Sequence, residues 1–574
     1  MSRWLRRYGI VLALLALTTA GCARLISSAV GVRPGEYAVE TSKVAVQMRD
    51  GARLASDLYL PKTEGPFPTV LIRTPYGKGG MSLPAKMYAK RGYAVIVQDV
   101  RGRFGSEGRW DPFRQEGPDG ADTIQWIKSR PWSNRKVGVW GMSYFGYTAW
   151  QGAGYSGKAD AAVAALTGSR IYDILYRQGA FCLSTGGHWG LGNAGRTPKQ
   201  GLKFRPGSAF TPPLDRIDNR AGRDLPFFNQ WIKHEDFDKY WEPASLADRW
   251  SKIDAPVLFV GGWYDLFAGS TLKDWQTMRR HAGPRAKKES RLVMGPWNHQ
   301  FSTSMHGMRY RGDTDVITFS KIYVEWFDEH LMNHGSTKLP RVKVYTTGKN
   351  EWQKLADWPP PDAENERWYF HSGGQAHRPG DGEFNRTKPG RESNDRFTHN
   401  PDKPVPTKGG ALYPPSDAGP ADISGQGKRD DVLVYTSSTF KRDLEVTGPI
   451  TATVYVTADT PDADVVVWLL DVYPDGKARI ITDGIARARY RKGGDNAWLS
   501  DTSPTAVDVD LWAASHVIKE GHKLRVHVAA SNYPRFAPNP CTKADPGSTT
   551  RFERSRVRVY HDQQHPSHVV LSVR

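Results

Sequence analysis

Residues 137–146 read VGVWGMSYFG, an apolar run that leads into a serine with a glycine on either side. The run 137–140 predicts a buried strand, and the residues after Ser143 are compatible with a helix. Because they lack side chains, Gly141 and Gly146 allow such a helix to pack close to the strand around a tight turn. This G-x-S-x-x-G pattern is close to the nucleophile elbow, which presents a serine hydroxyl at the carboxyl edge of a parallel sheet. We therefore predict that Ser143 is a nucleophile.

Strands and helices alternate on both sides of this unit. Predicted strands occupy residues 44–48, 54–60, 69–72, 93–97, 161–166, 256–260 and 291–294, and predicted helices occupy 84–91, 119–128, 271–281 and 317–332. Such alternation is typical of a parallel sheet covered by helices. Together with the elbow it predicts an α/β fold of the α/β-hydrolase type, with the catalytic domain at 37–169 and 250–345.

Two further regions differ from this pattern. Residues 170–249 are aromatic and irregular, with frequent glycine and proline, and predict a helical cap inserted into the catalytic domain. Residues 346–574 contain alternating runs at 450–456, 465–472, 524–528, 557–560 and 569–573, with an Asp-Gly turn at 475–476. These runs predict a C-terminal all-β jelly-roll sandwich.

A serine hydroxyl near neutral pH needs a base and an acid that orients the base. In this fold the acid and then the base follow the serine in the chain. Asp265 comes after the strand 256–260 and a Gly-Gly turn, and His299 follows the strand 291–294. We predict these two as acid and base; the alternative is that Asp265 caps a helix and His299 is an ordinary loop residue. Weaker base candidates that follow no core strand are His188, His281 and His306.

Acyl transfer also needs hydrogen-bond donors for the developing oxyanion. The backbone N–H of Tyr144, directly after the nucleophile, is one candidate. Tyr76 follows the early strand 69–72 and is a second candidate, although from the residues alone a structural tyrosine fits equally well. The mechanism requires no metal or organic cofactor, and no cluster of cysteine and histidine indicates a metal site.

Several segments together resemble the cocaine-esterase and X-prolyl dipeptidyl-peptidase family, which includes α-amino acid ester hydrolases and β-lactam acylases. They are GMSYFG (141–146), RTPYGKG (73–79), DVRGRFGSEG (99–108), GGWYDLF (261–267), GPWNH (295–299), WFDEHL (326–331), DVLVYTS (431–437), DVYPDG (471–476) and SNYPRF (531–536). The resemblance extends from about residue 37 to the end. It implies the three domains above and a role for the Tyr76 hydroxyl as the second oxyanion donor.

One departure from the family bears on the substrate. The α-amino acid ester hydrolases carry acidic residues just beyond the catalytic aspartate, whereas this chain has Leu266-Phe267-Ala268. A buried ammonium without a counter-charge is costly, which disfavours substrates with a free α-amine. Phe267 indicates an apolar or aromatic acyl pocket, unless it is a plain core residue. Cap residues that could also line this pocket are Trp189, Tyr172 and Tyr176.

The prediction is a serine hydrolase that cleaves small carboxylic esters, and less readily amides, through an acyl-enzyme. Two alternatives stay open. An exported X-prolyl dipeptidyl-peptidase would need an amine site, which Asp236 or Glu235 in the cap could supply. A non-catalytic lipoprotein would use the jelly roll to bind carbohydrate, and the Ser143, Asp265 and His299 set argues against it.

The N-terminus predicts export. Arg3, Arg6 and Arg7 precede a short apolar run at 10–17, and small residues then lead to Cys22. The run is too short to span a bilayer, so residues 1–21 are predicted to be a signal peptide. The residues around Cys22 resemble a bacterial lipoprotein cleavage box, which implies a lipid anchor at Cys22 and a tether at 22–36. The alternative is ordinary cleavage and a soluble secreted or periplasmic protein.

The formal net charge is +19, but the lysines and arginines are scattered in short runs. With no recognition helix, zinc pattern or stacking motif, we predict a generally basic surface and no nucleic-acid partner. Cys182 and Cys541 could form a disulfide after export or remain buried thiols. The oligomeric state is not encoded in any pattern of this kind.

Overall fold

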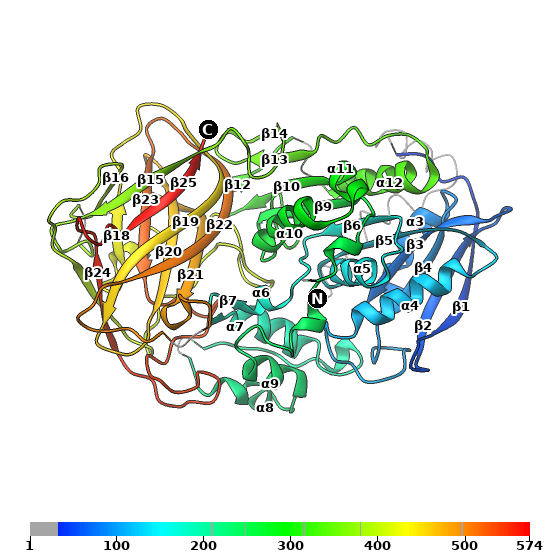
Figure 1. Ribbon diagram of the computed structural model, residues 1–574, viewed down its shortest axis with the longest axis horizontal. Coiled ribbons are helices and arrows are strands. Elements are labelled where there is room, and N and C mark those ends of the chain that lie inside the picture. The colour runs from blue at the N-terminus through cyan, green and yellow to red at the C-terminus, as the bar shows by residue number, and fades with distance from the viewer. Residues whose placement is uncertain are drawn as a thin grey trace.

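The computed structural model describes residues 32–574 except 208, 209, 247, 313, 315, 379, 495 and 496, and only the backbone of 316–319. Two large sheets lie end to end along the long axis of the molecule, and the short cap helices lie beneath their junction (Figure 1). Within the described residues, no helix is both long enough and apolar enough to span a membrane.

The α/β part is built on a ten-stranded sheet in the order β1-β2-β4-β3-β5-β6-β9-β10-β13-β14. Its strands are β1 (Val39–Gln47), β2 (Arg53–Pro61), β3 (Phe67–Thr74), β4 (Ala94–Asp99), β5 (Ser133–Met142), β6 (Ala161–Ala165), β9 (Val257–Tyr264), β10 (Arg291–Asn298), β13 (Val342–Thr346) and β14 (Glu351–Leu355). The strands from β4 to β13 are parallel, while β1, β2 and β14 pair antiparallel at the edges. The sheet continues to Leu355, beyond the boundary predicted at residue 345.

Helices cover both faces of this sheet. They are α3 (Ser82–Ala89), α4 (Glu116–Lys128), α5 (Ser143–Ser156), α10 (Ala268–His281), α11 (Pro284–Glu289) and α12 (Val316–Met332). Apolar residues of α4, α5 and α10 form a core on one face, and those of α3 and α12 form a core on the other. Helix α4 begins three residues earlier than predicted, with Pro118 in its first turn, where proline is tolerated.

The cap is an insertion, as predicted, but its helices are short. It contains α6 (Tyr172–Leu175), a hairpin of β7 (Tyr176–Arg177) and β8 (Ala180–Phe181), α7 (Leu183–Thr185), α8 (Ile217–Arg220) and α9 (Pro226–Lys233). Glycine and proline interrupt longer helices here, and a cluster of aromatic side chains that includes Phe228, Trp231 and Trp241 supplies the core.

The C-terminal part is an eleven-stranded, almost entirely antiparallel sheet around its own apolar core. Its strands are β15 (Glu364–His371), β16 (Glu383–Asn385), β17 (Asp395–His399), β18 (Leu433–Thr436), β19 (Leu444–Ala458), β20 (Asp464–Val472), β21 (Ala478–Arg487), β22 (Thr505–Ile518), β23 (Lys523–Ala529), β24 (Ser555–Tyr560) and β25 (His568–Val573). The predicted fold class, an α/β core joined to an all-β domain, is confirmed. Cys182 and Cys541 are both free and buried, so they form no disulfide with each other.

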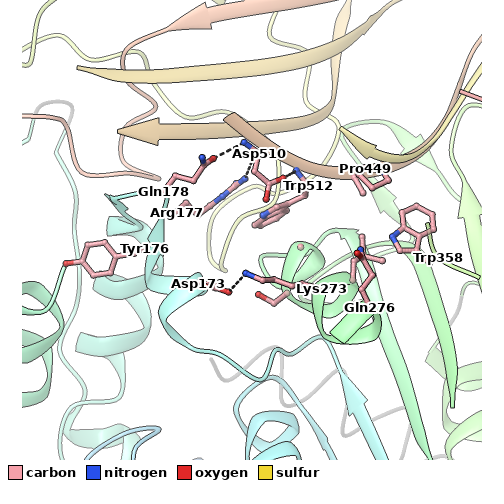
Figure 2. Close-up of a pocket in the computed structure, with 14 residues that line it drawn as sticks. Asp173, Tyr176, Arg177, Gln178, Lys273, Gln276, Trp358, Pro449, Asp510 and Trp512 are labelled. Carbon is pink, nitrogen blue, oxygen red and sulfur yellow. Dashed lines mark hydrogen bonds and ion pairs between the residues drawn. The ribbon is translucent and has the colours of Figure 1, made fainter. Parts of the chain in front are cut away.

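The three parts meet around a pocket shown in Figure 2. The guanidinium carbon of Arg177, from the cap, lies 3.9 Å from the ring centroid of Trp512 in the C-terminal domain. Arg177 Nη2 also donates to the main-chain oxygen of Asp510 at 3.0 Å. Gly269 of α10 packs so closely that a Cβ there would lie 2.4 Å from Trp512 Nε1. These contacts fix the cap and the C-terminal domain against the α/β core.

Candidate active site

Ser143 is the first residue of α5, directly after β5, and has a left-handed φ of 56°. Such a conformation in a non-glycine residue is strained and is typical of functional turns. A Cβ at Gly141 would lie 2.0 Å from the main-chain oxygen of Phe145, and one at Gly146 would lie 2.9 Å from Thr167 Cγ2. Both glycines are therefore required for the tight turn that exposes the Ser143 hydroxyl to the site.

Ser143, His299 and Asp265 form a continuous hydrogen-bonded chain. His299 Nε2 lies 2.9 Å from Ser143 Oγ, and His299 Nδ1 lies 2.5 Å from Asp265 Oδ2. Because a carboxylate can only accept, Nδ1 carries the proton and Nε2 is free to accept one from the serine. Asp265 is fully buried, and its second oxygen accepts the Phe267 N–H at 2.9 Å. The arrangement can move a proton from Ser143 to His299.

Two donors lie beside the serine. Tyr144 is in the first turn of α5, where backbone N–H groups have no partner within the helix. The hydroxyl oxygen of Tyr76 accepts a hydrogen bond from Trp189 Nε1 at 2.9 Å. Burial raises the pKa of Tyr76 to about 12, so its hydroxyl stays protonated near neutral pH. Since Trp189 bonds to the oxygen, the Tyr76 proton can point toward a group bound at Ser143.

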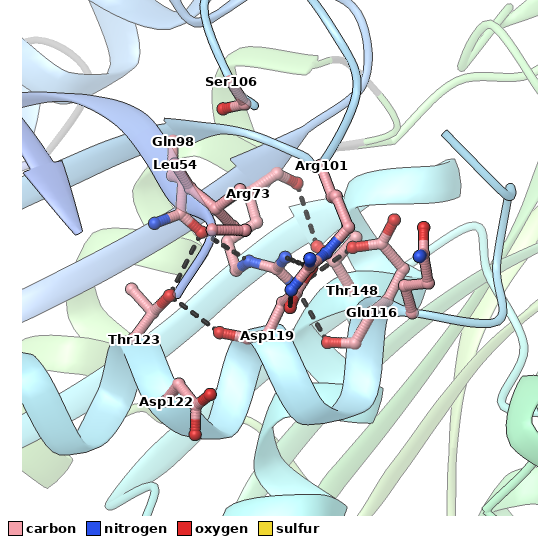
Figure 3. A network of polar contacts seen from close by, with 12 residues as sticks. Leu54, Arg73, Gln98, Arg101, Ser106, Glu116, Asp119, Asp122, Thr123 and Thr148 are labelled. Carbon is pink, nitrogen blue, oxygen red and sulfur yellow. Dashed lines mark hydrogen bonds and ion pairs between the residues drawn. The ribbon is translucent and has the colours of Figure 1, made fainter. Parts of the chain in front are cut away.

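A buried polar network supports this side of the site (Figure 3). The Tyr144 hydroxyl donates to Glu116 Oε1 at 2.8 Å and accepts the Phe113 N–H at 2.9 Å. Arg73 Nη1 lies 3.0 Å from Glu116 Oε2, and both side chains are only 2% exposed. Burial raises the pKa of Glu116, and the Arg73 charge opposes that shift. No local pattern in the sequence marks a buried carboxylate as the partner of a distant arginine, so this pair was not predicted.

An apolar cavity opens at Ser143. The residues that line it are Phe113, Ser143, Tyr144, Tyr147, Ile171, Ile174, Leu175, Thr185, Trp189, Leu266, Phe267 and Tyr413. None of these side chains carries a carboxylate or an amine. The Phe267 ring is stacked on His299 with 5.7 Å between their centroids. Tyr413 comes from an irregular loop of the C-terminal domain, which explains why periodicity in the sequence did not identify it.

The structure separates the four predicted pocket residues into two pairs. Trp189 and Phe267 line the cavity, whereas Tyr172 and Tyr176 do not. The Tyr172 hydroxyl donates to the main-chain oxygen of Glu235 at 2.7 Å, and the Tyr176 hydroxyl donates to that of Trp231 at 3.1 Å. Their rings stack on each other, with 5.4 Å between centroids. Both tyrosines thus hold the cap together rather than face Ser143.

The remaining candidates lie elsewhere. His306 bonds to the main-chain oxygen of Asp417 at 3.2 Å, and His188 packs against the Phe204 ring. Glu235 is bonded to Arg489 at 2.6 Å, and neither it nor Asp236 lines the cavity. Across the described ranges, no group of three or more His, Cys, Asp or Glu residues could hold a metal ion. Cys22 lies outside the described residues.

Comparisons with known proteins cover almost the whole chain. Residues 50–300 match the X-Pro dipeptidyl-peptidase (S15 family) model, and residues 333–570 match the X-Pro dipeptidyl-peptidase C-terminal non-catalytic domain. Cocaine esterase of Rhodococcus sp. (strain MB1 Bresler) is 33% identical over 94% of this chain and 99% of that protein.

Two solved structures extend the likeness to the fold. An α-amino acid ester hydrolase has a TM-score of 0.81 at 25% identity, covering 93% of this chain and 97% of its own. An aminopeptidase from the marine sediment archaeon Thaumarchaeota archaeon has a TM-score of 0.79 at 23% identity, covering 94% and 97%. With the family matches, these findings show that the chain is a hydrolase that belongs to the cocaine esterase and X-Pro dipeptidyl-peptidase family.

Proposed function

We propose that this protein is a carboxylesterase that cleaves esters of small apolar or aromatic acids through an acyl-enzyme. Ser143 attacks the carbonyl carbon while His299 takes its proton, and Asp265 stabilises the imidazolium that results. The Tyr144 N–H and the Tyr76 O–H donate to the oxyanion. His299 then protonates the leaving alcohol, and a water molecule, deprotonated by His299, releases the acid.

The observation that carries this proposal is the hydrogen-bonded chain from Ser143 Oγ through His299 to Asp265, with distances of 2.9 and 2.5 Å. The serine, base and acid come from three separate segments, and each lies at the carboxyl end of a strand of one parallel sheet. Ligand sites of open α/β sheets form at this edge.

The cavity supports the choice of substrate. Its side chains are mostly apolar or aromatic, and no carboxylate among them could hold an ammonium group. Placing a charged amine there would require removing its water without a counter-charge, which is costly. An apolar acyl group packed against Phe267 and Tyr413 has no charge, so its burial does not carry this cost.

A rate comparison tests this function. Initial rates are measured on the nitrophenyl ester of benzoic acid and on an X-Pro nitroanilide, with Ser143→Ala as the inactive control. We expect the ester to be cleaved much faster and the variant to be silent on both substrates. Faster cleavage of the nitroanilide would contradict the proposal.

X-Pro dipeptidyl-peptidase activity is the second candidate, favoured by the two family models that match the chain. It needs a negatively charged group for the substrate's free N-terminus. The two cap candidates are poorly suited, because Glu235 is paired with Arg489 and Asp236 lies outside the cavity lining. This activity would therefore require the cap to rearrange.

We also propose that the chain is exported and anchored by a lipid on Cys22. The support is the positive N-terminus, the short apolar run and the small residues before Cys22. Metabolic labelling with a fatty acid should mark the protein, and Cys22→Ser should abolish the label. Labelling that persists in Cys22→Ser would contradict the anchor.

A further inference from the structure

A groove on the C-terminal domain has six lysine or arginine side chains among its 13 lining residues. It has a volume of about 650 Å³ and lies along the paired strands β17 and β24. Six basic and two acidic side chains line it: Arg396, Lys403, Lys428, Arg429, Arg556 and Arg558, with Asp430 and Asp431. In Figure 1, β24 is at the left end of the molecule, opposite the catalytic sheet.

Most of this positive charge is not neutralised locally. Asp431 pairs with Arg429 at 2.6 Å, and Asp459 pairs with Arg556 at 2.7 Å. Among the described residues, no carboxylate lies within ion-pair distance of the three exposed cations Arg396, Lys403 and Lys428. In the part of the chain that the structure describes, the Arg558 guanidinium bonds only to the main-chain oxygen of Asp501, at 3.3 Å. The groove therefore presents cations that are available to an anionic partner.

The strand register makes this arrangement costly for the free protein. Arg396 on β17 stands directly opposite Arg558 on β24. Like charges in that position destabilise a strand pair. An alternative explanation is that charges on an edge strand such as β17 prevent aggregation. That explanation does not account for Lys403 and Lys428, which line the groove but do not belong to the edge strand. A partner that brings negative charge would offset the repulsion.

We propose that this groove binds a linear acidic polysaccharide through its carboxylate groups. Guanidinium groups match carboxylates with two parallel hydrogen bonds, and two of the four unpaired cations, Arg396 and Arg558, are arginines. A flat lipid surface fits a concave groove poorly. Single-stranded nucleic acid needs open aromatic faces for stacking, and the phenyl ring in this lining, Phe397, is only 5% exposed.

The test titrates fluorescently labelled polygalacturonate into the full-length protein at several salt concentrations. The groove variant is Arg396→Gln with Arg558→Gln. The matched control, Lys43→Gln with Lys62→Gln, removes the same charge from exposed positions on or next to β1 and β2, at the other end of the molecule. Thermal unfolding and ester hydrolysis confirm that each variant is folded.

We expect the groove variant to bind about tenfold more weakly and to have a shallower dependence on salt, because fewer counterions are released. The control should bind within about twofold of wild type, as should Ser143→Ala, since the groove is remote from the catalytic site. Equal losses of affinity for polygalacturonate in the groove variant and the control would overturn the proposal, because they would indicate that binding depends only on the total charge of the protein. Preferential binding to phosphatidylglycerol vesicles or to an oligothymidylate would also overturn it.

Discussion

Replacing Tyr76 by phenylalanine tests the oxyanion site most directly. The change removes one of two proposed donors and keeps the ring that packs beside Tyr144 and Phe145. Loss of one such donor lowers kcat by about 100- to 1000-fold, or about 2.7–4 kcal/mol. KM should change little, because the hydrogen bond strengthens only as charge develops on the oxygen.

Trp189 provides a second step in the same test. Its Nε1–H bonds to the Tyr76 oxygen at 2.9 Å, and a neutral hydrogen bond of this kind contributes about 1 kcal/mol. Trp189→Phe should therefore lower kcat about fivefold in the wild-type background. Combined with Tyr76→Phe it should lower kcat by a smaller factor, because the contribution that Trp189 makes through the Tyr76 hydroxyl is gone and only its packing in the cavity lining remains.

The assay is the initial rate of nitrophenyl ester hydrolysis over a range of substrate concentrations. Tyr172→Phe is the matched control, because its hydroxyl bonds to the cap backbone and should not affect kcat. The reasoning is refuted if Tyr76→Phe retains more than a third of the activity. It is also refuted if Trp189→Phe lowers kcat by the same factor in the wild-type and the Tyr76→Phe backgrounds.

Three further outcomes follow from buried groups. Phe267→Ala should raise KM for a benzoyl ester about 10- to 150-fold and leave the KM for an acetyl ester nearly unchanged, since a buried ring contributes about 1.5–3 kcal/mol; equal changes for both esters would contradict this. Glu116→Gln should lower the free energy of unfolding by about 3 kcal/mol in denaturant, because buried Arg73 loses the nearer of its two carboxylate partners and keeps only Asp119, at 3.8 Å; an unchanged midpoint would refute that account. Burial raises the pKa of Asp274 to about 7, so the folded state keeps a proton that the unfolded chain loses above about pH 4. Stability should therefore fall as pH rises from about 4 to about 7. Asp274→Asn should make the melting temperature depend less on pH over that range, and an unchanged pH dependence in the variant would count against this explanation.

Local patterns in the sequence predicted much of the fold. Buried strands, helix periodicity and the two glycines around Ser143 are properties of short segments, and they led to the correct fold class. Some errors were at boundaries, and several strands, among them β15, β21 and β22, were not predicted. Proline in the first turn hid the start of α4, and the sheet continues through β13 and β14 past the predicted domain limit.

For the candidate site, too, local patterns predicted some residues correctly and others wrongly. Asp265 and His299 were predicted because each follows a strand of the parallel sheet, and adjacent strands bring their carboxyl ends together. Tyr172 and Tyr176 were predicted to face the pocket on composition alone, and the structure turns their hydroxyls toward the cap backbone. Composition cannot determine the direction in which a side chain points.

By itself, the sequence determined the strand–turn–helix unit at Ser143 and marked Asp265 and His299 as candidates for acid and base, because these patterns depend on neighbouring residues. Only the tertiary structure decided which distant side chains meet. It brings Tyr413 to the cavity and gathers cations from residues 396–403, 428–429 and 556–558 into one groove, although the same charges are scattered along the chain. Packing and electrostatic interactions depend on distance through space, which separation along the chain does not reveal.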